Sequence, residues 1–202
     1  MATIDNFEQI KKLLSFESED DFYFCQIIQR KKDHPEGLPG KNNNSRAIKT
    51  YCIKSIESLD FYKDEMIQLA AFHNARVGIN LNKRSFEKIA FQTLRKITDQ
   101  ILNKDYYHTK KAFDSCCGTY SNEPNKKWII DIDDKDLDPT KLLKFIKDLQ
   151  PAGDKFIDKI NTKNGYHLIV KPFDMNKFHT NTVFKIENID VHKDNPTILY
   201  IP

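Results

Sequence analysis

The segment WIIDIDDKD, residues 128–136, combines the most strand-like run of the chain with a dense group of acids. Its apolar part, Trp128-Ile129-Ile130, leads directly into Asp131, and Asp133 follows two positions later. Alternate residues of a strand point to the same face, so these two carboxylates are expected to project together from the strand end. Like charges placed in this way repel each other unless a positive group lies between them.

Two interpretations of this acidic end are open. Closely placed carboxylates favour a hard divalent cation such as Mg2+ or Mn2+, and two such ions can activate an attacking oxygen and hold a triphosphate leaving group. Alternatively, the later acids are solvated in a loop before a helix that Asp138 caps and Pro139 begins. Asp-x-Asp is short and common, so the pattern alone does not decide between them.

Composition places the chain among globular proteins. Of its 202 residues, 39% are hydrophobic and 30% are charged, which suits one large domain or two small ones. The net charge of +3 neither requires nor excludes a nucleic-acid partner. The cysteines form no C-x-x-C pair, so free thiols are expected. No signal peptide or long apolar span is visible, so we expect no membrane association and a cytoplasmic location. The cysteines are Cys25, Cys52, Cys116 and Cys117.

Hydrophobic periodicity and turn signals predict helices and strands that alternate in both halves, which indicates an α+β or α/β fold. A polar turn at 122–125 is the expected seam between residues 1–121 and 122–202. The expected helices cover 3–15, 58–73, 86–101, 106–116 and 139–150. The expected strands cover 22–30, 47–54, 75–81, 127–133, 155–161, 166–171, 183–191 and 197–201. In the strand 75–81, the side chains of Val77, Ile79 and Leu81 are predicted to share one face.

Two later segments carry further polar candidates. Asp190, in KIENIDVHKD at 185–194, would complete a three-carboxylate site if its strand neighbours 127–133; otherwise it is an ordinary strand-end acid. In NTKNGYHLIVKPF at 161–173, Asn164 and Gly165 predict a type I′ hairpin turn.

The same hairpin holds residues that suit a phosphate chain. Thr162, Lys163 and exposed backbone N–H groups of the turn could contact phosphate oxygens. His167 and Lys171 are separated by an even number of residues, so they are expected to share a strand face. A lone histidine in a strand is more often structural than catalytic, and that interpretation is open on these residues alone.

In this order, the three segments resemble the three motifs of the archaeo-eukaryotic primase superfamily, which includes primases and primase-polymerases. The first motif, an apolar run ending in Asp-x-Asp, corresponds to 128–133. The second, a small residue, any residue and then His, corresponds to Gly165-Tyr166-His167. The third, an apolar residue followed by Asp, corresponds to Ile189-Asp190. The resemblance implies an α+β fold in which an N-terminal α/β unit packs against an RRM-like catalytic unit, the whole of 1–202 forming one catalytic domain.

The resemblance also implies roles for these residues. Asp131, Asp133 and Asp190 would bind catalytic Mg2+ or Mn2+. His167, Lys163 and the turn formed by residues 162–165 would bind the triphosphate of an NTP or dNTP. The activity implied is template-directed nucleotidyl transfer on single-stranded DNA, with a replicative helicase as a candidate partner in trans. ARVGINLNKRS at 75–85 resembles small phage and plasmid members, for which the location would be the bacterial host cytoplasm.

The chain departs from the family pattern at two places. Many relatives carry Ser where Gly165 stands, so a hydroxyl contact to phosphate would be missing. Many also carry Arg or Lys shortly after the third motif, whereas no basic residue follows Asp194. Either the triphosphate clamp is thinner in this chain, or Lys171 or Lys193 substitutes for the missing residue.

Several basic and aromatic residues are candidates for nucleic-acid contact. Arg76, Lys83 and Arg84 flank the strand 75–81 and could neutralise backbone phosphates; surface solubility and a helix start at Ser85 are the alternative. Tyr106-Tyr107-His108 could stack on bases, or belong to the core or an ordinary surface. The basic loop with Arg30, Lys31, Lys32, Lys41 and Arg46 could clamp nucleic acid, or be a solvated loop.

Two other functions compete with nucleotidyl transfer. The first is a non-catalytic RRM-like module that binds single-stranded nucleic acid. Such modules stack bases on aromatic residues of central strands, whereas this chain has Asp131 and Asp133 there. The second is a metal-dependent nicking nuclease, which is ranked lower because the sequence has no His-x-His pair.

Overall fold

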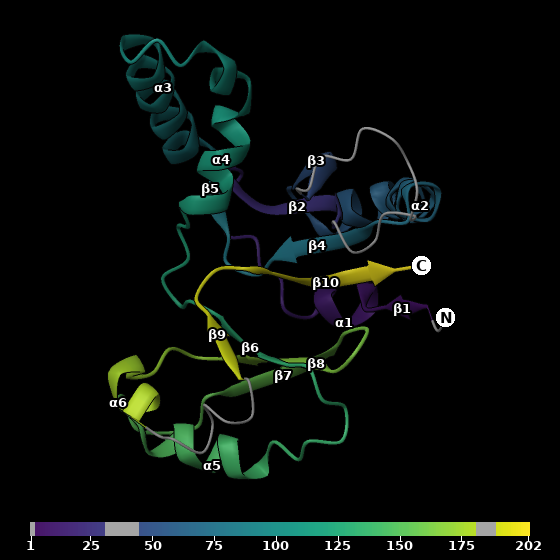
Figure 1. Cartoon of the computed structure of the whole chain (residues 1–202), viewed down its shortest axis with the longest axis vertical. Coiled ribbons are helices and arrows are strands. Elements are labelled where there is room, and N and C mark those ends of the chain that lie inside the picture. The colour runs from purple at the N-terminus through teal and green to yellow at the C-terminus, as the bar shows by residue number, and fades with distance from the viewer. Residues whose placement is uncertain (1–2, 31–44, 181–188) are drawn as a thin grey trace.

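The computed structural model describes residues 3–30, 45–180 and 189–202, which form an α+β fold with two antiparallel sheets (Figure 1). The predicted class is therefore confirmed. The two sheets share one core, because Ile129, Ile160 and Ile169 of the second sheet pack in the same cluster as Val77 and Ile79 of the first.

The first sheet joins both ends of the described chain. Its order is β1-β10-β4-β2-β3, all neighbours are antiparallel, and β5 pairs with the start of β2. Val77, Ile79 and Leu81 are buried, as predicted. The strands are β1 (Ile4–Asp5), β2 (Asp21–Gln29), β3 (Arg46–Ile53), β4 (Arg76–Asn80), β5 (Arg84–Ser85) and β10 (Pro196–Ile201).

Two groups of helices pack on this sheet. The first group, α1 and α2, contributes Phe7, Ile10 and Leu59 to the shared core. The second group, α3, η2 and α4, packs on Phe22 and Phe24 of β2 and extends away from both sheets (Figure 1). The bounds are α1 (Phe7–Lys11), α2 (Ile56–His73), α3 (Phe86–Leu102), η2 (Tyr106–Lys111) and α4 (Ala112–Thr119).

The second sheet has the order β7-β8-β6-β9, again fully antiparallel. Along the chain its elements follow as strand, helix, strand, strand, helix, strand, which is the split β-α-β arrangement. Trp128, Ile130 and Ile132 pack against the two helices, so Asp131 lies on the opposite face, toward the first sheet. The elements are β6 (Trp128–Ile132), α5 (Thr140–Asp148), β7 (Phe156–Asn161), β8 (Tyr166–Val170), α6 (Met175–Thr180) and β9 (Asp190–His192).

Three of the expected elements differ from those observed. The helix expected at 106–116 is divided into the 3-10 helix η2 and the α-helix α4. The helix expected at 3–15 is divided into β1 and the shorter α1, because Ile4 pairs with Ile201 and the Asn6 side chain donates to the carbonyl of Ile198. The strand expected at 183–191 lies mostly outside the described residues, and its described part is β9.

The last strand, β10, returns to the first sheet and lies between β1 and β4. The expected division into 1–121 and 122–202 therefore does not coincide with the division between the sheets. Because β4 pairs with β10 on one side and with β2 on the other, it has no open edge. Ile198, Leu199 and Ile201 of β10 are buried in that position.

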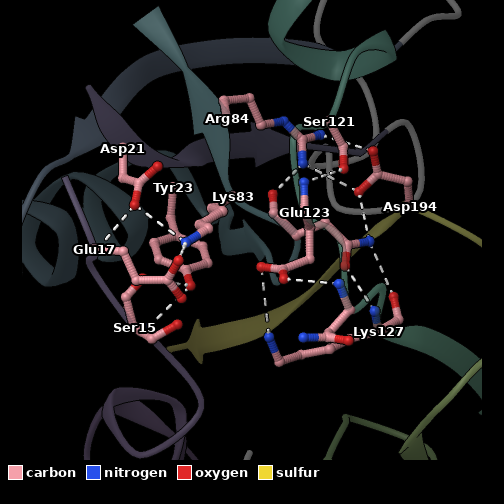
Figure 2. A network of polar contacts seen from close by, with 12 residues as sticks. Ser15, Glu17, Asp21, Tyr23, Lys83, Arg84, Ser121, Glu123, Lys127 and Asp194 are labelled. Atoms are coloured by element: carbon pink, nitrogen blue, oxygen red, sulfur yellow. Dashed lines mark hydrogen bonds and ion pairs between the residues drawn. The ribbon is translucent and has the colours of Figure 1, made fainter.

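An ion pair between a buried arginine and a half-buried aspartate joins the two sheets (Figure 2). The Arg84 guanidinium is fully buried and donates to both carboxylate oxygens of Asp194, at 3.1 and 3.0 Å. The Asn82 side chain donates to the same carboxylate at 3.0 Å and to the Lys127 carbonyl at 3.0 Å. We call Asn82, Arg84 and Asp194 the clasp, because they join the β4–β5 loop to the turn before β10 and to the start of β6.

Removing one side of the clasp tests its importance. Asp194→Ala is expected to lower the free energy of unfolding by about 3–5 kcal/mol, because it leaves a buried guanidinium without its counter-charge. Denaturant titration measures this difference. The control is Glu65→Ala, which breaks an exposed ion pair with Lys49 and should cost less than about 1 kcal/mol. Equal losses in the two variants would contradict the role given to the clasp.

Candidate functional site

Three motif residues lie in one row across the second sheet. Asp131 on β6 is directly opposite His167 on β8 and, on its other side, directly opposite Asp190 on β9. Directly opposite residues of antiparallel strands have Cβ atoms about 4.5–5.5 Å apart and point to the same face. We call Asp190, Asp131 and His167 the acid–histidine row. The structure thus brings together three residues that are far apart in the sequence.

His167 and Asp131 interact directly. Nε2 of His167 lies 3.3 Å from Oδ1 of Asp131, and their side chains are 11% and 34% exposed. The hydrogen bond from His167 lowers the pKa of Asp131, and electrostatic interactions with His167, His192 and Arg30 act in the same direction. Burial of the carboxylate opposes this shift. His192 is directly opposite Ile129, which precedes Asp131 by two residues on β6. Its side chain therefore points to the same face of the sheet as the acids.

The hairpin between β7 and β8 lies against the end of β6. A Cβ atom at Gly165 would be only 1.8 Å from the carbonyl oxygen of Ile132 and 3.0 Å from Cα of Asp133. This close approach excludes any larger residue at position 165 and accounts for the glycine there. Asp133 itself is exposed just beyond the end of β6.

The hairpin is present as predicted, but its predicted turn type is wrong. Neither Asn164 nor Gly165 has the positive φ that a type I′ turn requires. Asn161 pairs with Tyr166, so four residues connect the strands. Thr162 closes this connection: its backbone N–H donates to the Gly165 carbonyl, and its hydroxyl accepts from the Gly165 N–H.

The hairpin also lines a cavity of about 510 Å3. Lys135, Lys159 and Lys163 contribute to its wall, and no acidic side chain does so in the part of the chain that the structure describes. A cavity of this size can hold a nucleotide-sized ligand, and its three lysines favour an anion. Thr162, Asn164 and Gly165 line the same cavity.

Lys171 does not join the hairpin residues. It follows β8 directly, after Val170, which pairs with Trp128 at the other end of β6. Four residues of strand separate it from His167, about 13 Å along the chain. Lys193 lies at that same end, with Nζ 5.2 Å from the centre of the Trp128 ring. Neither lysine therefore lies at the hairpin turn, and their substitution for the missing basic residue of the triphosphate clamp stays a prediction.

Two of the three basic residues expected to contact nucleic acid are structural. Arg84 belongs to the clasp. Lys83 is 3% exposed, and its Nζ lies 3.1 Å from both Asp21 and Glu17 (Figure 2). Both cations are buried and paired with neighbouring acids, so they do not face phosphate, and this prediction is corrected. Arg76 is half-buried on β4, and its contact with nucleic acid stays a prediction.

The aromatic candidates lie on the surface. Tyr106 and Tyr107 are 63% and 66% exposed on η2, and Nζ of Lys110 lies 4.3 Å from the centre of the Tyr107 ring. Exposed rings beside lysines can stack on bases, so this contact stays a prediction. Lys31, Lys32 and Lys41 lie outside the described residues.

The chemistry of the acids fits a hard divalent cation, but their side chains are not gathered around one point. Asp131 and Asp190 are like charges directly opposite each other, an arrangement that destabilises a sheet and that a cation would relieve. In the described residues, however, no three His, Cys, Asp or Glu side chains are close enough together to hold a metal ion. Asp131 is turned to His167, while Asp133 and Asp190 are exposed.

Three residues near the site were not predicted from the sequence. Thr197 of β10 contacts His167, and Lys135 and Lys159 line the cavity. For Thr197 no local signal exists, because β10 reaches this place through pairing with distant strands. Lys159 shares a strand with Asn161 beside the hairpin, and strand alternation could have suggested it. All four cysteines are free thiols, as expected.

Gly165→Ala tests the close approach of the hairpin to β6. We expect a loss of about 1–3 kcal/mol in the free energy of unfolding, because the new methyl group overlaps the Ile132 carbonyl. The matched control is Gly118→Ala in α4, where the Cβ atom meets nothing within 4 Å. Alanine favours a helix over glycine, so this control should gain up to about 1 kcal/mol. A Gly165→Ala protein with wild-type stability would contradict the described packing.

Comparison with known proteins adds no relative: no protein family, no curated protein and no solved structure matches this chain. Among the described helices, none is both long and apolar enough to cross a membrane. The function is therefore argued from the motifs and from the geometry of the site.

Proposed function

We propose that the protein is a template-directed nucleotidyltransferase of the primase-polymerase kind, which extends or starts a strand on single-stranded DNA from NTPs or dNTPs. The observation that carries this proposal is the acid–histidine row. Residues from all three motifs occupy adjacent strands at the same level of one sheet. The β-α-β-β-α-β order of that sheet supports the RRM-like catalytic unit of the proposal.

Asp131, Asp133 and Asp190 would hold the Mg2+ or Mn2+ ions. When bound, such ions neutralise the triphosphate and make the attacking 3′-hydroxyl more acidic. The lowered pKa of Asp131 supports this role, because the carboxylate is ionised at neutral pH. Asp190, on the open edge strand β9, adds a second carboxylate to the same face. Positioning and charge neutralisation supply most of the catalysis in such centres.

His167 and the hairpin would bind the triphosphate. Nε2 of His167 already faces an acidic oxygen, and a phosphate oxygen could take that position as acceptor. Lys163, with Thr162 and the turn, borders the cavity in which Lys135 and Lys159 add positive charge. Lys171 has no part in this arrangement.

Arg76 and the exposed Tyr106 and Tyr107 are the candidates for contact with single-stranded DNA. A replicative helicase acting in trans is the proposed partner, and the cytoplasm, that of a bacterial host for a phage or mobile-element protein, is the proposed location.

Nucleotide incorporation on single-stranded DNA tests the proposal. Asp131→Asn, Asp133→Asn and Asp190→Asn should each reduce incorporation on the order of a hundredfold or more, as loss of a charge-stabilising group does. Primed and unprimed templates, Mg2+ or Mn2+, and separate NTP and dNTP pools define the activity. The control is Asp136→Asn, an exposed acid of the same loop, which should keep wild-type activity. Incorporation by Asp131→Asn at the wild-type rate would refute the assignment.

A non-catalytic module that binds single-stranded nucleic acid is the second candidate. Two observations favour it: the acids are not gathered into one cluster, and Tyr106 and Tyr107 are exposed. Such a module would need no cation at Asp131.

Metal-dependent stability separates the two candidates. A cation that binds only the folded state stabilises it, by about 2.7 kcal/mol at a hundred times its Kd. We expect Mn2+ or Mg2+ to raise the melting temperature of the wild type and of Asp136→Asn, but not of Asp131→Asn. A melting temperature that no cation changes, in a protein that binds single-stranded DNA, would favour the binding module.

A further inference from the structure

The cavity beside the hairpin is enclosed by residues of both sheets. From the second sheet, the hairpin and Lys159 of β7 form its wall, and Lys135 comes from the loop after β6. From the first sheet, Ile4 of β1 and Ile201 of β10, which pair with each other, close the opposite side. Figure 1 shows the hairpin between β7 and β8 on the same side of the molecule as the two chain ends. The cavity therefore lies where the two sheets meet.

Hydrogen bonds from the N-terminal segment fix the strand that carries Lys159. The Asn6 side chain donates to the carbonyl of Asn161 at 3.0 Å, and the Gln9 side chain donates to the carbonyl of Lys159 at 2.9 Å. The backbone of this wall is thus held in place by the fold itself. A ligand that binds here does not have to order it, which lowers the cost of binding.

Tyr166 determines where two of the cavity's lysines lie. Nζ of Lys159 is 3.8 Å from the centre of the Tyr166 ring, whose face attracts a cation. The Tyr166 hydroxyl donates to the carbonyl of Leu137 and so fixes the loop that carries Lys135. One aromatic side chain therefore orients lysines from two separate segments toward the same cavity.

Lys159 and Tyr166 lie on the other face of the second sheet from the acid–histidine row. Tyr166 and His167 are consecutive in β8, so their side chains point to opposite faces. Tyr166 packs in the cluster beneath α5 and α6, whereas His167 contacts Thr197 of the first sheet. No residue of the row lines the cavity. An anion in the cavity therefore does not depend on a contact with the row.

The lysines of the cavity are not paired with acids. Among the residues that the structure describes, none of Lys135, Lys159 and Lys163 forms an ion pair with a carboxylate. Asp134, beside Lys135, accepts instead from the backbone N–H of Asp136. Like charges that converge without a counter-charge repel each other, and an anion between them relieves this repulsion. A cavity of about 510 Å3 has room for an anion with several oxygens.

We propose that this cavity binds a phosphate chain without a divalent cation: Lys135, Lys159 and Lys163 contact its oxygens, and Tyr166 is the positioning residue for Lys135 and Lys159. The ammonium groups supply the positive charge directly, through charge-assisted hydrogen bonds to phosphate. The chain is the triphosphate of a free nucleotide or the backbone of a nucleic-acid strand, which share this chemistry. Binding here needs neither a metal ion nor the row, so it stands independently of nucleotidyl transfer.

The alternative is that these lysines are solvated surface residues that keep the protein soluble. In that case a phosphate chain would bind them no better than other exposed lysines. Replacing one of them would then have the same effect as replacing a lysine outside the cavity.

Calorimetric titration with inorganic triphosphate, in the presence of EDTA, tests the proposal. We expect the wild type to bind it at one site. Lys135→Gln and Lys159→Gln should each weaken binding about three- to tenfold, the scale of one charge-assisted contact. The control is Lys144→Gln, an exposed residue of α5 outside the cavity, which should bind as the wild type does.

Tyr166→Phe tests the positioning role, because it keeps the ring beneath Lys159 and removes the hydroxyl that binds Leu137. We expect it to weaken binding of triphosphate in the wild-type background. Combined with Lys135→Gln, it should cause no further loss, because both changes act through the same contact. An equal loss in both backgrounds would show that Tyr166 does not act through Lys135.

Competition identifies the source of the phosphate chain. A single-stranded oligothymidylate that displaces the triphosphate, and that itself binds less well to Lys135→Gln and Lys159→Gln, indicates a nucleic-acid backbone. An oligothymidylate that does not compete, together with a nucleoside triphosphate that does, indicates a free nucleotide.

Three results would overturn the inference. The first is that the wild type does not bind triphosphate in EDTA, and the second is that the lysine variants bind as tightly as Lys144→Gln. The third is that His167→Gln loses binding while the lysine variants keep it, which would place the anion at the acid–histidine row. Nucleotide incorporation tests the proposed function separately, so either proposal can fail while the other stands.

Discussion

The fold depends on how the chain neutralises one fully buried guanidinium, that of Arg84. A buried charge without a partner is strongly destabilising, so Arg84 requires the Asp194 carboxylate. Asp194 lies between β9 and β10, and Asn82 binds both this acid and the backbone just before β6. The β4–β5 loop of the first sheet thereby determines where two strands of the second sheet begin or end. Loss of either partner of such a pair is costly, so the clasp favours the docking in which both partners stay together.

This docking explains the position of the candidate site. The shared core holds the apolar residues of both sheets, while Asp131 and His167 occupy the same face of the second sheet as the buried Ile129 and Ile169. Strand alternation therefore places polar groups next to a dry core. Thr197, which comes from the first sheet, satisfies the buried nitrogen of His167. The other nitrogen lies beside the half-buried Asp131.

Burial decides whether a basic residue of this chain can contact a ligand. Lys83 and Arg84 look like surface residues in the sequence, yet each is enclosed and paired with acids. Lys135 and Lys159 are not among the site residues predicted from the sequence, yet they border the cavity at the hairpin. A lysine or arginine has the same chemistry in both settings. Only the strand pairings decide whether its charge faces an internal carboxylate or an open cavity.

The sequence by itself determined most helices and strands, the hairpin between β7 and β8, and the motif residues Asp131, His167 and Asp190, because these depend on local periodicity, turn residues and short spacings. The tertiary structure alone decided that β10 joins the first sheet, that Asp131 has His167 and Asp190 as direct neighbours, and that Lys171 lies away from the hairpin. The physical reason is that register and strand order arise from pairing between distant segments. A one-residue shift of register would leave every local pattern unchanged and yet move the acids to the other face.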